Sequence, residues 1–217
     1  MNLTCAVPKG RPLEDLLPYF QAMGGGGDVW NEVSRKLTVV DEALGLTFFL
    51  AKAMDVPTYV EYGAADIGIS GKDVLMELDK PVVELLDLGI SVCRLIVAVP
   101  SDSPVQRVSD LPFNARVATK YPRVAEAYFN RRGIQVEVIP LGGSVELAPL
   151  VGLADAIVDL TETGRTLHEN GLRIVGHVME SSLRLIANPV SYKVEYRRIR
   201  ELARRLQAAL RTEVEAG

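Results

Sequence analysis

The chain has 217 residues, of which 48% are hydrophobic and 24% are charged, and its 24 Lys and Arg against 28 Asp and Glu give a net charge of −4. These values are typical of a globular protein with a sizeable core, and they exclude a disordered or fibrous chain. No apolar run approaches the roughly 20 residues of a membrane-spanning helix, and the acidic balance is not that of a nucleic-acid-binding protein. The first residues lack a basic region followed by an apolar stretch, so we expect no signal peptide and a cytoplasmic protein.

Short apolar runs alternate with helical patterns, which predicts an α/β fold of parallel sheets covered by helices. The predicted strands are 3–7, 48–51, 67–70, 82–86, 92–99, 115–119, 136–139, 156–160, 173–177 and 183–187. The predicted helices are 13–23, 56–62, 72–78, 123–132, 145–151 and 192–211. In the last helix Ile199, Leu202, Leu206 and Leu210 form one apolar stripe, and the basic residues between them form a solvated or partner-binding face.

The cysteine and histidine content argues against a disulfide and against a zinc site. Cys5 and Cys93 each lie in an apolar strand-like run, which indicates reduced core thiols. The two histidines, His168 and His177, form no cluster with the cysteines, so we expect no zinc site.

One short pattern occurs twice, as YGAADIGI at 62–69 and VGLADAIV at 151–158. In each copy the glycine is expected to end a helix and the aspartate to cap the turn into a buried strand. The repeat indicates two similar α/β lobes. We therefore expect a ligand cleft between the lobes, where strand carboxyl ends and helix N-termini meet.

The stretch AIVDLTETGRT at 156–166 has the pattern of a phosphate-binding loop. A buried strand ends at Asp159, and the loop that follows leads into a short helix at 167–170. Gly164 lets backbone N–H groups approach a phosphate, the threonines supply hydroxyls, and Arg165 adds positive charge. An acidic residue after a strand, followed by Thr-Gly-x-Thr, is typical of sites for 5-phosphoribosyl-1-pyrophosphate (PRPP). The alternative is a plain Thr-rich helix cap.

Cations follow three other predicted strands. Lys9 and Arg11 flank a glycine after the first strand, Lys72 follows another glycine, and Lys120 follows the strand 115–119. We expect these strand ends to deliver their lysines to the same side of a sheet, where they suit a polyphosphate. Solvated turns are the alternative.

Together these segments resemble the ATP phosphoribosyltransferase family, which carries out the first step of histidine biosynthesis. The matching stretches are AVPKGR at 6–11, SRKL at 34–37, DVPTYVEYGAADIGISGKDVL at 55–75, ATKY at 118–121, GSVELAP at 143–149, GLAD at 152–155, DLTETGRTL at 159–167 and NGL at 170–172. The resemblance implies a two-lobed, periplasmic-binding-protein-like fold with a ligand cleft between the lobes. Residues 1–90 plus 181–217 would form the first lobe, and 91–180 would form the second lobe, which carries the PRPP loop.

The resemblance implies that the chain joins ATP N1 to the ribose C1′ of PRPP, with Mg²⁺ held mainly through substrate phosphates rather than by protein ligands. The catalytic residues implied are Lys9, Arg35 and Lys52, and Lys52 stands where many relatives have arginine. The PRPP-binding residues implied are Glu146, Asp159, Thr161, Glu162, Thr163, Gly164, Arg165 and Thr166. The ATP-binding residues implied are Lys9, Gly10, Arg11, Gly71, Lys72 and Asp73.

The length of the chain resembles that of the family's short form, which works with a regulatory subunit similar to histidyl-tRNA synthetase. We therefore expect a homodimer within a hetero-oligomer, and no inhibition of this chain alone by histidine. Two other functions fit such a fold. One is a solute-binding or effector-sensing module, and the other is a prephenate dehydratase-like enzyme, which would not need the Thr-Gly-Arg-Thr loop.

Overall fold

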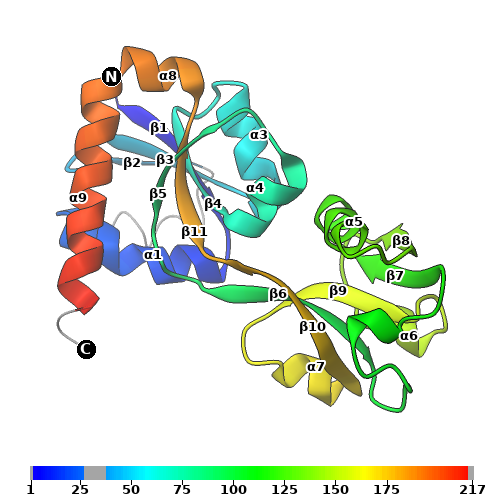
Figure 1. Ribbon diagram of the computed structural model, residues 1–217. Helices are drawn as coiled ribbons and strands as arrows, with labels where there is room; N and C mark the ends of the chain where they lie inside the picture. The colour runs from blue at the N-terminus through cyan, green and yellow to red at the C-terminus, as the bar shows by residue number, and fades with distance from the viewer. Residues whose placement is uncertain (1, 27–37, 215–217) are drawn as a thin grey trace. The chain divides into compact units, whose positions relative to one another are not determined.

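The computed structural model describes residues 2–26 and 38–214, which form two compact units (Figure 1). The first unit comprises Met1–Ser91 together with Ser182–Gly217, and the second unit is Val92–Ser181. The chain therefore leaves the first unit after Ser91 and returns to it after Ser181. None of the described helices is long and apolar enough to cross a membrane.

The first unit is built on a six-stranded mixed sheet in the order β2-β3-β1-β4-β11-β5. Its strands are β1 (Leu3–Pro8), β2 (Thr38–Asp41), β3 (Leu46–Ala51), β4 (Ile67–Gly71), β5 (Val83–Asp87) and β11 (Leu183–Ala187). β1 runs parallel to both β3 and β4, whereas β2 and β11 run antiparallel to their neighbours. β1 is almost wholly apolar because helices cover both of its faces.

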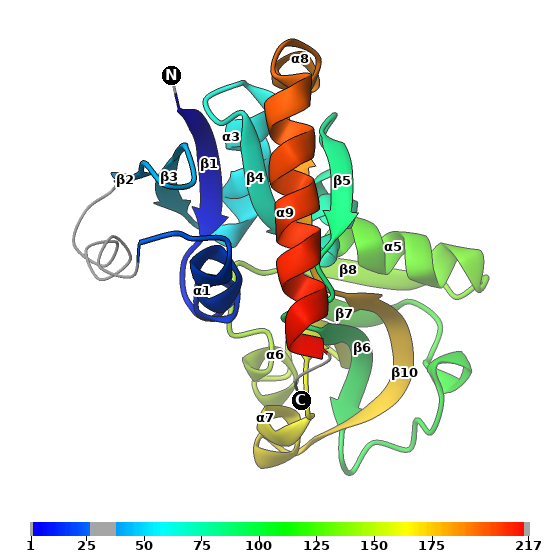
Figure 2. The same ribbon diagram turned by 90° about the vertical axis from the view of Figure 1, so that its left-hand side faces the viewer.

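Helices cover each face of this sheet. The apolar stripes of α1 (Arg11–Ala22) and α9 (Tyr196–Val214) pack on one face, and α9 runs along it (Figure 2). The stripe expected on the last helix is confirmed, because Ile199, Leu202 and Leu206 are buried. The helices α3 (Val56–Glu61) and α4 (Lys72–Leu78) pack on the other face. A short 3-10 helix, η1 (Ala53–Asp55), precedes α3, and α8 (Pro189–Val194) precedes α9.

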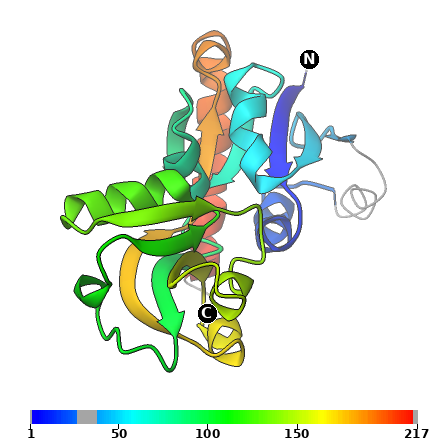
Figure 3. The ribbon, with the colours of Figure 1, turned by 90° about the vertical axis from the view of Figure 1, so that its right-hand side faces the viewer.

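The second unit is built on a five-stranded sheet in the order β10-β6-β9-β7-β8. Its elements are β6 (Cys93–Pro100), η2 (Val108–Asp110), β7 (Ala115–Thr119), α5 (Pro122–Arg131), β8 (Val136–Pro140), α6 (Leu147–Leu150), β9 (Ala156–Thr161), α7 (Arg165–Glu169) and β10 (Leu172–Ser181). β7 runs parallel to β8 and β9. α5 packs on one face of the sheet, whereas α6 and α7 pack on the other (Figure 3).

The internal repeat is a structural unit that occurs once in each lobe. The glycine after α3 and the glycine after α6 both have φ of +71°, a left-handed conformation that favours glycine. Asp66 then accepts a hydrogen bond from the backbone N–H of Thr4 at 2.8 Å. Asp155 accepts one from the N–H of Arg116, also at 2.8 Å. In both units the aspartate therefore fastens the new strand to a neighbouring parallel strand.

Four features differ from the sequence-based expectation. The sheets are mixed rather than purely parallel, and β2 was not predicted. The predicted helix 192–211 is two helices, because α8 ends at Val194 and α9 begins at Tyr196. The side chain of Asn188 caps the start of α8 by accepting from the N–H groups of Val190 and Ser191. Cys5 is buried as expected, but Cys93 is only half-buried.

Candidate active site

In the first unit the parallel strands β3, β1 and β4 end at the same edge of the sheet. Pro8 at the end of β1 pairs with Ala51 at the end of β3, so Lys9 and Lys52 follow neighbouring strand ends, and both are exposed. β4 lies on the other side of β1 and is followed by Lys72. Three lysines on adjacent strand ends make this edge suitable for a polyphosphate.

The turn after β1 presents cations beside an open stretch of backbone. The N–H of Lys9 donates to the carbonyl of Ala51 at 3.0 Å, which holds the turn against β3. Gly10 has φ of +85°, and no described atom lies within 4 Å of the place where a Cβ would stand. Arg11 begins α1, and its Nε lies 3.7 Å from Oδ2 of Asp15 one turn further on.

The turn after β4 is more closed. A Cβ on Gly71 would lie 2.3 Å from Oδ1 of Asp73, so the Asp73 carboxylate packs directly against this glycine. Asp73 is only 5% exposed. Nζ of Lys72 forms an ion pair with Oε2 of Glu84 at 2.7 Å. The structure therefore gives Asp73 a packing role and gives Lys72 a carboxylate partner that the sequence did not predict.

In the second unit the parallel strands β8, β7 and β9 likewise end at one edge. Lys120 directly follows β7, Asp159 lies near the end of β9, and Glu146 lies in the loop between β8 and α6. The register places Thr119 opposite Val158, so Lys120 and Asp159 follow paired positions on neighbouring strands. One cation and two carboxylates thus gather at this edge.

The environment of Asp159 disfavours its charged form. Burial raises the pKa of this carboxyl above its ordinary value, and the negative charge of Glu146 adds to the effect. A 2.8 Å hydrogen bond from the N–H of Leu160 and the charge of Lys120 act in the opposite direction. The net result is a raised pKa, so ionised Asp159 would gain from a nearby hydroxyl donor or cation.

The loop after β9 is organised by its own hydroxyl groups. Gly164 has φ of +77°, and its N–H donates to Oγ1 of Thr161 at 2.9 Å. The N–H of Arg165 donates to Oγ1 of Thr163 at 3.4 Å. Both hydroxyls therefore hold the turn that leads into α7, but neither caps the helix, whose N-cap is Gly164 and has no side-chain hydrogen bond. A hydroxyl that accepts still has its own O–H to donate, so phosphate binding stays a prediction.

The start of this loop is held by Arg94, whereas the side chain of Arg165 at its end is held only by an exposed carboxylate. The carbonyl of Glu162 accepts a hydrogen bond from Nη2 of Arg94 at 3.2 Å. Nε of Arg165 donates to Oε1 of Glu169 at 2.8 Å, but both side chains are largely exposed. An exposed pair of this kind contributes little to stability, so the guanidinium can exchange its partner for an anion at little cost.

The structure places the predicted site residues in two groups. In the second unit, at the ends of β8 and β9, lie Glu146, Asp159, Thr161, Glu162, Thr163, Gly164, Arg165 and Thr166. In the first unit, at the ends of β1, β3 and β4, lie Lys9, Gly10, Arg11, Lys52, Gly71, Lys72 and Asp73. Arg35 lies outside the described residues.

Two residues of the second unit were not included among the predicted site residues. The expectation that Lys120 shares a sheet with Lys9 and Lys72 is wrong, because β7 belongs to the second unit and Lys120 stands beside Asp159. Thr119 is fully buried, and its hydroxyl donates to the carbonyl of Val158 at 2.7 Å. The signal for both was the polar pair Thr-Lys at the end of a buried strand.

The described residues form no protein cage for a metal ion. No group of three or more His, Cys, Asp or Glu side chains in residues 2–26 and 38–214 could hold one. A divalent cation at this site would therefore need most of its ligands from a bound substrate.

Comparisons with known proteins agree with one another. The family model described as HisG: ATP phosphoribosyltransferase matches residues 52–208. A protein of Symbiobacterium thermophilum named ATP phosphoribosyltransferase is 51% identical over 94% of this chain and 93% of its own length. One of the same name from Sorangium cellulosum is 50% identical over 95% of each chain.

Solved structures give the same result for the fold. The chain of an ATP phosphoribosyl transferase (HisG:HisZ) complex from Thermotoga maritima is 33% identical, with a TM-score of 0.81 over 97% of this chain and 98% of that one. The periplasmic aliphatic sulphonate binding protein SsuA of Escherichia coli is 14% identical, with a TM-score of 0.64 over 99% of this chain and 75% of that one, and it shows the two-lobed fold alone. With the family model covering most of the chain and near-full-length relatives about half identical to it, this chain belongs to the ATP phosphoribosyltransferase family.

Proposed function

We propose that this chain joins ATP and PRPP to give N1-(5-phosphoribosyl)-ATP and pyrophosphate, the first step of histidine biosynthesis. The lone pair of adenine N1 forms a bond to the ribose C1′, the bond from C1′ to the pyrophosphate oxygen breaks, and pyrophosphate leaves with the electron pair. The observation that carries the proposal is the family match over residues 52–208.

The second unit is the proposed site of PRPP. The 5-phosphate would accept hydrogen bonds from the threonine hydroxyls of the loop Thr161–Thr166, whose O–H groups remain able to donate, with Arg165 supplying positive charge. The ribose hydroxyls would donate to Asp159 and Glu146. What supports this assignment is the raised pKa of Asp159, because a hydroxyl donor relieves the cost of its buried charge.

The first unit is the proposed site of ATP. Lys9, Arg11, Lys52 and Lys72 lie at one edge of its sheet, and Gly10 leaves space for a close approach of phosphate to the backbone. Arg35 remains a proposed catalytic residue that faces the pyrophosphate. Lys9 and Lys52 would share that role, because they follow neighbouring strand ends.

The chemistry demands positioning more than proton transfer. Adenine N1 has a free lone pair at neutral pH, so no strong base is needed. Two anionic substrates must instead be aligned, and the charge that develops on the leaving pyrophosphate must be stabilised by cations. Lysines and arginines at strand ends serve both purposes.

Mg²⁺ is the proposed cofactor. Asp159 and Glu146 fit the ion as a pair of neighbouring carboxylates whose mutual repulsion a cation would relieve. Most of its ligands would be pyrophosphate oxygens, because the described residues provide no larger group of ligands. When bound, the ion supplies positive charge to the leaving group.

A protein partner and a location follow from the same family. The Thermotoga maritima relative was solved as a HisG:HisZ complex. We propose that this chain likewise forms a homodimer within a hetero-oligomer, with a regulatory subunit similar to histidyl-tRNA synthetase, and that it works in the cytoplasm.

The proposed function is tested by incubating the purified chain, with and without the regulatory subunit, with ATP, PRPP and Mg²⁺. Pyrophosphate release that requires both substrates, together with a product of the mass of phosphoribosyl-ATP, is the expected result. Release with PRPP alone would indicate hydrolysis. A wild-type protein that forms no adduct in either assembly would contradict the proposal.

A further inference from the structure

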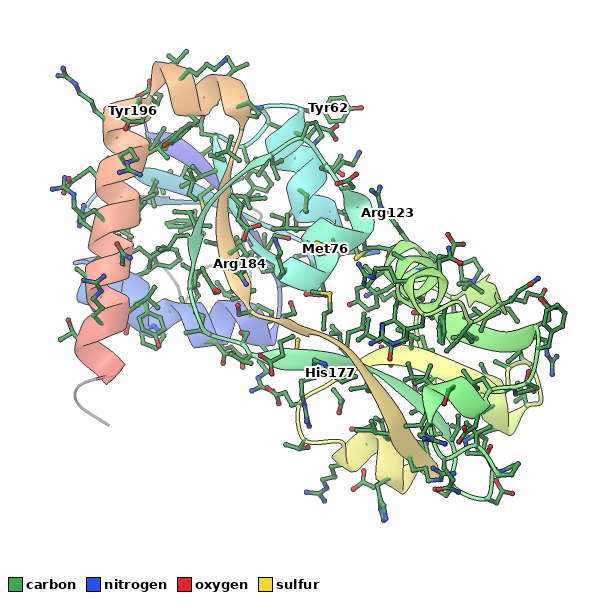
Figure 4. The ribbon with its side chains drawn as sticks, viewed as in Figure 1. Tyr62, Met76, Arg123, His177, Arg184 and Tyr196 are labelled. Atoms are coloured by element: carbon green, nitrogen blue, oxygen red, sulfur yellow. The ribbon has the colours of Figure 1, made fainter. Side chains whose placement is uncertain are left out.

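Five contacts of the first unit form a closed ring beside the strand edge just described. The backbone N–H of Lys72 donates to the carbonyl of Ser182 at 3.0 Å, and the Ser182 hydroxyl donates to Oδ1 of Asp87 at 2.7 Å. Oδ2 of Asp87 lies 2.7 Å from Nη1 of Arg184. The same nitrogen lies 3.4 Å from Oε1 of Glu84, and Oε2 of Glu84 lies 2.7 Å from Nζ of Lys72. Figure 4 labels Arg184, at the start of β11.

This ring differs from a set of isolated surface ion pairs. Single exposed pairs contribute little, but charges in a network that shares partners hold one another in place. The side chains of Arg184, Lys72 and Glu84 are 18%, 30% and 34% exposed, and that of Asp87 is 50% exposed. Two of the five contacts are hydrogen bonds of Ser182, one to the Lys72 backbone and one to Asp87, which fix the positions of the charged groups.

One atom of the ring has no partner. Nε of Arg184 is buried and lacks a hydrogen-bond acceptor among the described residues. A buried donor without an acceptor is unfavourable, so Arg184 has a hydrogen bond still to make. Asp87 lies closer to Arg184 than Glu84 does, but both of its oxygens are already engaged, one by Ser182 and one by Nη1 of Arg184. Glu84 touches Arg184 through Oε1, and its Oε2 becomes available once Lys72 releases it.

The ring joins two functionally important places. Lys72 is a cation of the proposed ATP edge, and Ser182 is the residue at which the chain re-enters the first unit. The other crossing point has a similar arrangement. The hydroxyl of Ser91 donates to Oδ2 of Asp15 at 2.5 Å, and Asp15 is the ion-pair partner of Arg11, another cation of the proposed ATP edge.

We propose that Glu84 is a positioning residue that holds Lys72 in this ring until the phosphates of ATP replace Glu84 as the partner of Lys72. Lys72 then pairs with phosphate, Glu84 turns its freed oxygen to Nε of Arg184, and the contacts that hold Ser182 loosen. Nucleotide binding on the first unit is thereby coupled to one of the two places where the chain passes between the units. This inference rests on the proposed function, because it takes Lys72 as a ligand of ATP.

The first test is the substitution Glu84→Gln, which keeps the size of the side chain and removes its charge. The phosphates of ATP then no longer compete with the Glu84 carboxylate for Lys72. We therefore expect the Kd of ATP, measured by calorimetry, to fall by about threefold or more. The matched control is Glu61→Gln, since Glu61 pairs with Lys80 in the same unit at 2.8 Å with 21% and 29% exposure. It should leave the Kd unchanged. In a Lys72→Ala background Glu84→Gln should give no gain.

The second test follows the coupling itself by hydrogen exchange of backbone amides. In the wild type and in Glu61→Gln, adding ATP should speed exchange at Lys72 and at the start of β11, because the ring opens. In Glu84→Gln the ring is already broken, so ATP should produce no further change there. Ser182→Ala, which breaks the ring without touching a cation, should also abolish the response while leaving the Kd of ATP unchanged.

The outcomes separate this inference from the proposed function. A wild type that neither binds ATP nor forms the adduct overturns both. A wild type that is active, with Glu84→Gln binding ATP no more tightly than the wild type, overturns the inference alone. Thermal unfolding of every variant shows whether it is folded. Glu84→Asp retains the charge but is too short to reach both Lys72 and Arg184, so it should lower the Kd of ATP as Glu84→Gln does.

Discussion

Asp159 combines a cost to stability with a predicted role in substrate binding. Burial and Glu146 raise the pKa of its carboxyl, so the folded state prefers the protonated form. The stability that this preference provides is complete below the ordinary pKa of aspartate, near 4, and is lost as the pH rises through the raised value. At neutral pH the ionised group therefore destabilises the fold.

The substitution Asp159→Asn should stabilise the protein at pH 7 and impair catalysis. Removing the buried charge should raise Tm, at about 2–4 °C for each kcal/mol gained in a chain of this size. The increase should shrink as the pH falls through the raised pKa toward 4, because the wild-type carboxyl becomes protonated as well. Calorimetric scans from pH 4 to pH 8 measure it, and a lower Tm at pH 7 would contradict the assigned environment.

Arg165→Ala and Thr166→Ala should weaken PRPP binding far more than ATP binding. Hydrogen bonds to a charged group contribute about 1.5–3 kcal/mol, so the Kd of PRPP should rise by roughly ten- to a hundredfold. Neither residue is buried, so Tm should change little. Calorimetry with each substrate gives the answer, with Arg107→Ala on the same unit as the control. An equal loss of both affinities would show that the loop is not specific for PRPP.

Among the secondary-structure elements, the repeated Gly-x-Ala-Asp unit is the clearest link between sequence and fold. Burial alone would raise the pKa of Asp66, but hydrogen bonds from Thr4 and Ser191 and the charge of Arg198 lower it below the ordinary value. The stability that these bonds provide is therefore present above about pH 4 and is lost as the pH falls through the lowered pKa. This is the opposite trend to that of Asp159.

Asp66→Asn should destabilise the protein at neutral pH. One oxygen accepts from both the N–H and the hydroxyl of Thr4, and the other accepts from Ser191, so the cost should be about 1–3 kcal/mol. Asp155→Asn is the matched control in the second unit, because that exposed carboxylate accepts a backbone N–H at the same place in the repeat. Its effect on urea unfolding should be smaller. Equal effects would mean that the Ser191 and Thr4 hydroxyls contribute nothing.

Most elements could be predicted because their own residues determine them. Strands such as Leu3–Pro8 are buried on both faces and are therefore mostly apolar. β2 could not be predicted, because its burial alternates over only four residues and it exists through its pairing with β3. The start of α8 had a signal, Asn188 followed by Pro189, which the prediction of a single helix from residue 192 missed.

The candidate site was predictable in its parts but not in its pairings. The order of residues shows that Lys9, Lys72 and Asp159 follow strands, and parallel strands bring such residues to one edge. The order of residues does not show which sheet each strand joins. Lys120 was therefore expected beside Lys9 and Lys72, although its strand belongs to the sheet of the second unit. The ion pair of Lys72 with Glu84 depends on β5 and β4 flanking β11, which no local pattern encodes.

At the scale of the whole molecule, the second unit is continuous in sequence and has its own core. Its two apolar clusters lie on opposite faces of one sheet and are made only of residues from Val92–Ser181. A fragment of residues 92–181 should therefore fold alone and unfold cooperatively in urea. It should bind PRPP and not ATP. Nuclear magnetic resonance of the fragment should show dispersed amide signals, as a folded domain does. An unfolded fragment would show that the second unit depends on the rest of the chain.

The first unit is different, because β11 lies between β4 and β5 in its sheet, and the whole second unit separates β11 from both in the sequence. During synthesis on the ribosome, β1 to β5 emerge with a gap in the sheet, and β4 and β5 keep unpaired edges until β11 arrives. The second unit can finish folding in that interval. A nascent chain stalled before Leu183 would therefore carry a native second unit beside an incomplete sheet, whose unpaired strand edges are open to chaperones at that stage of translation.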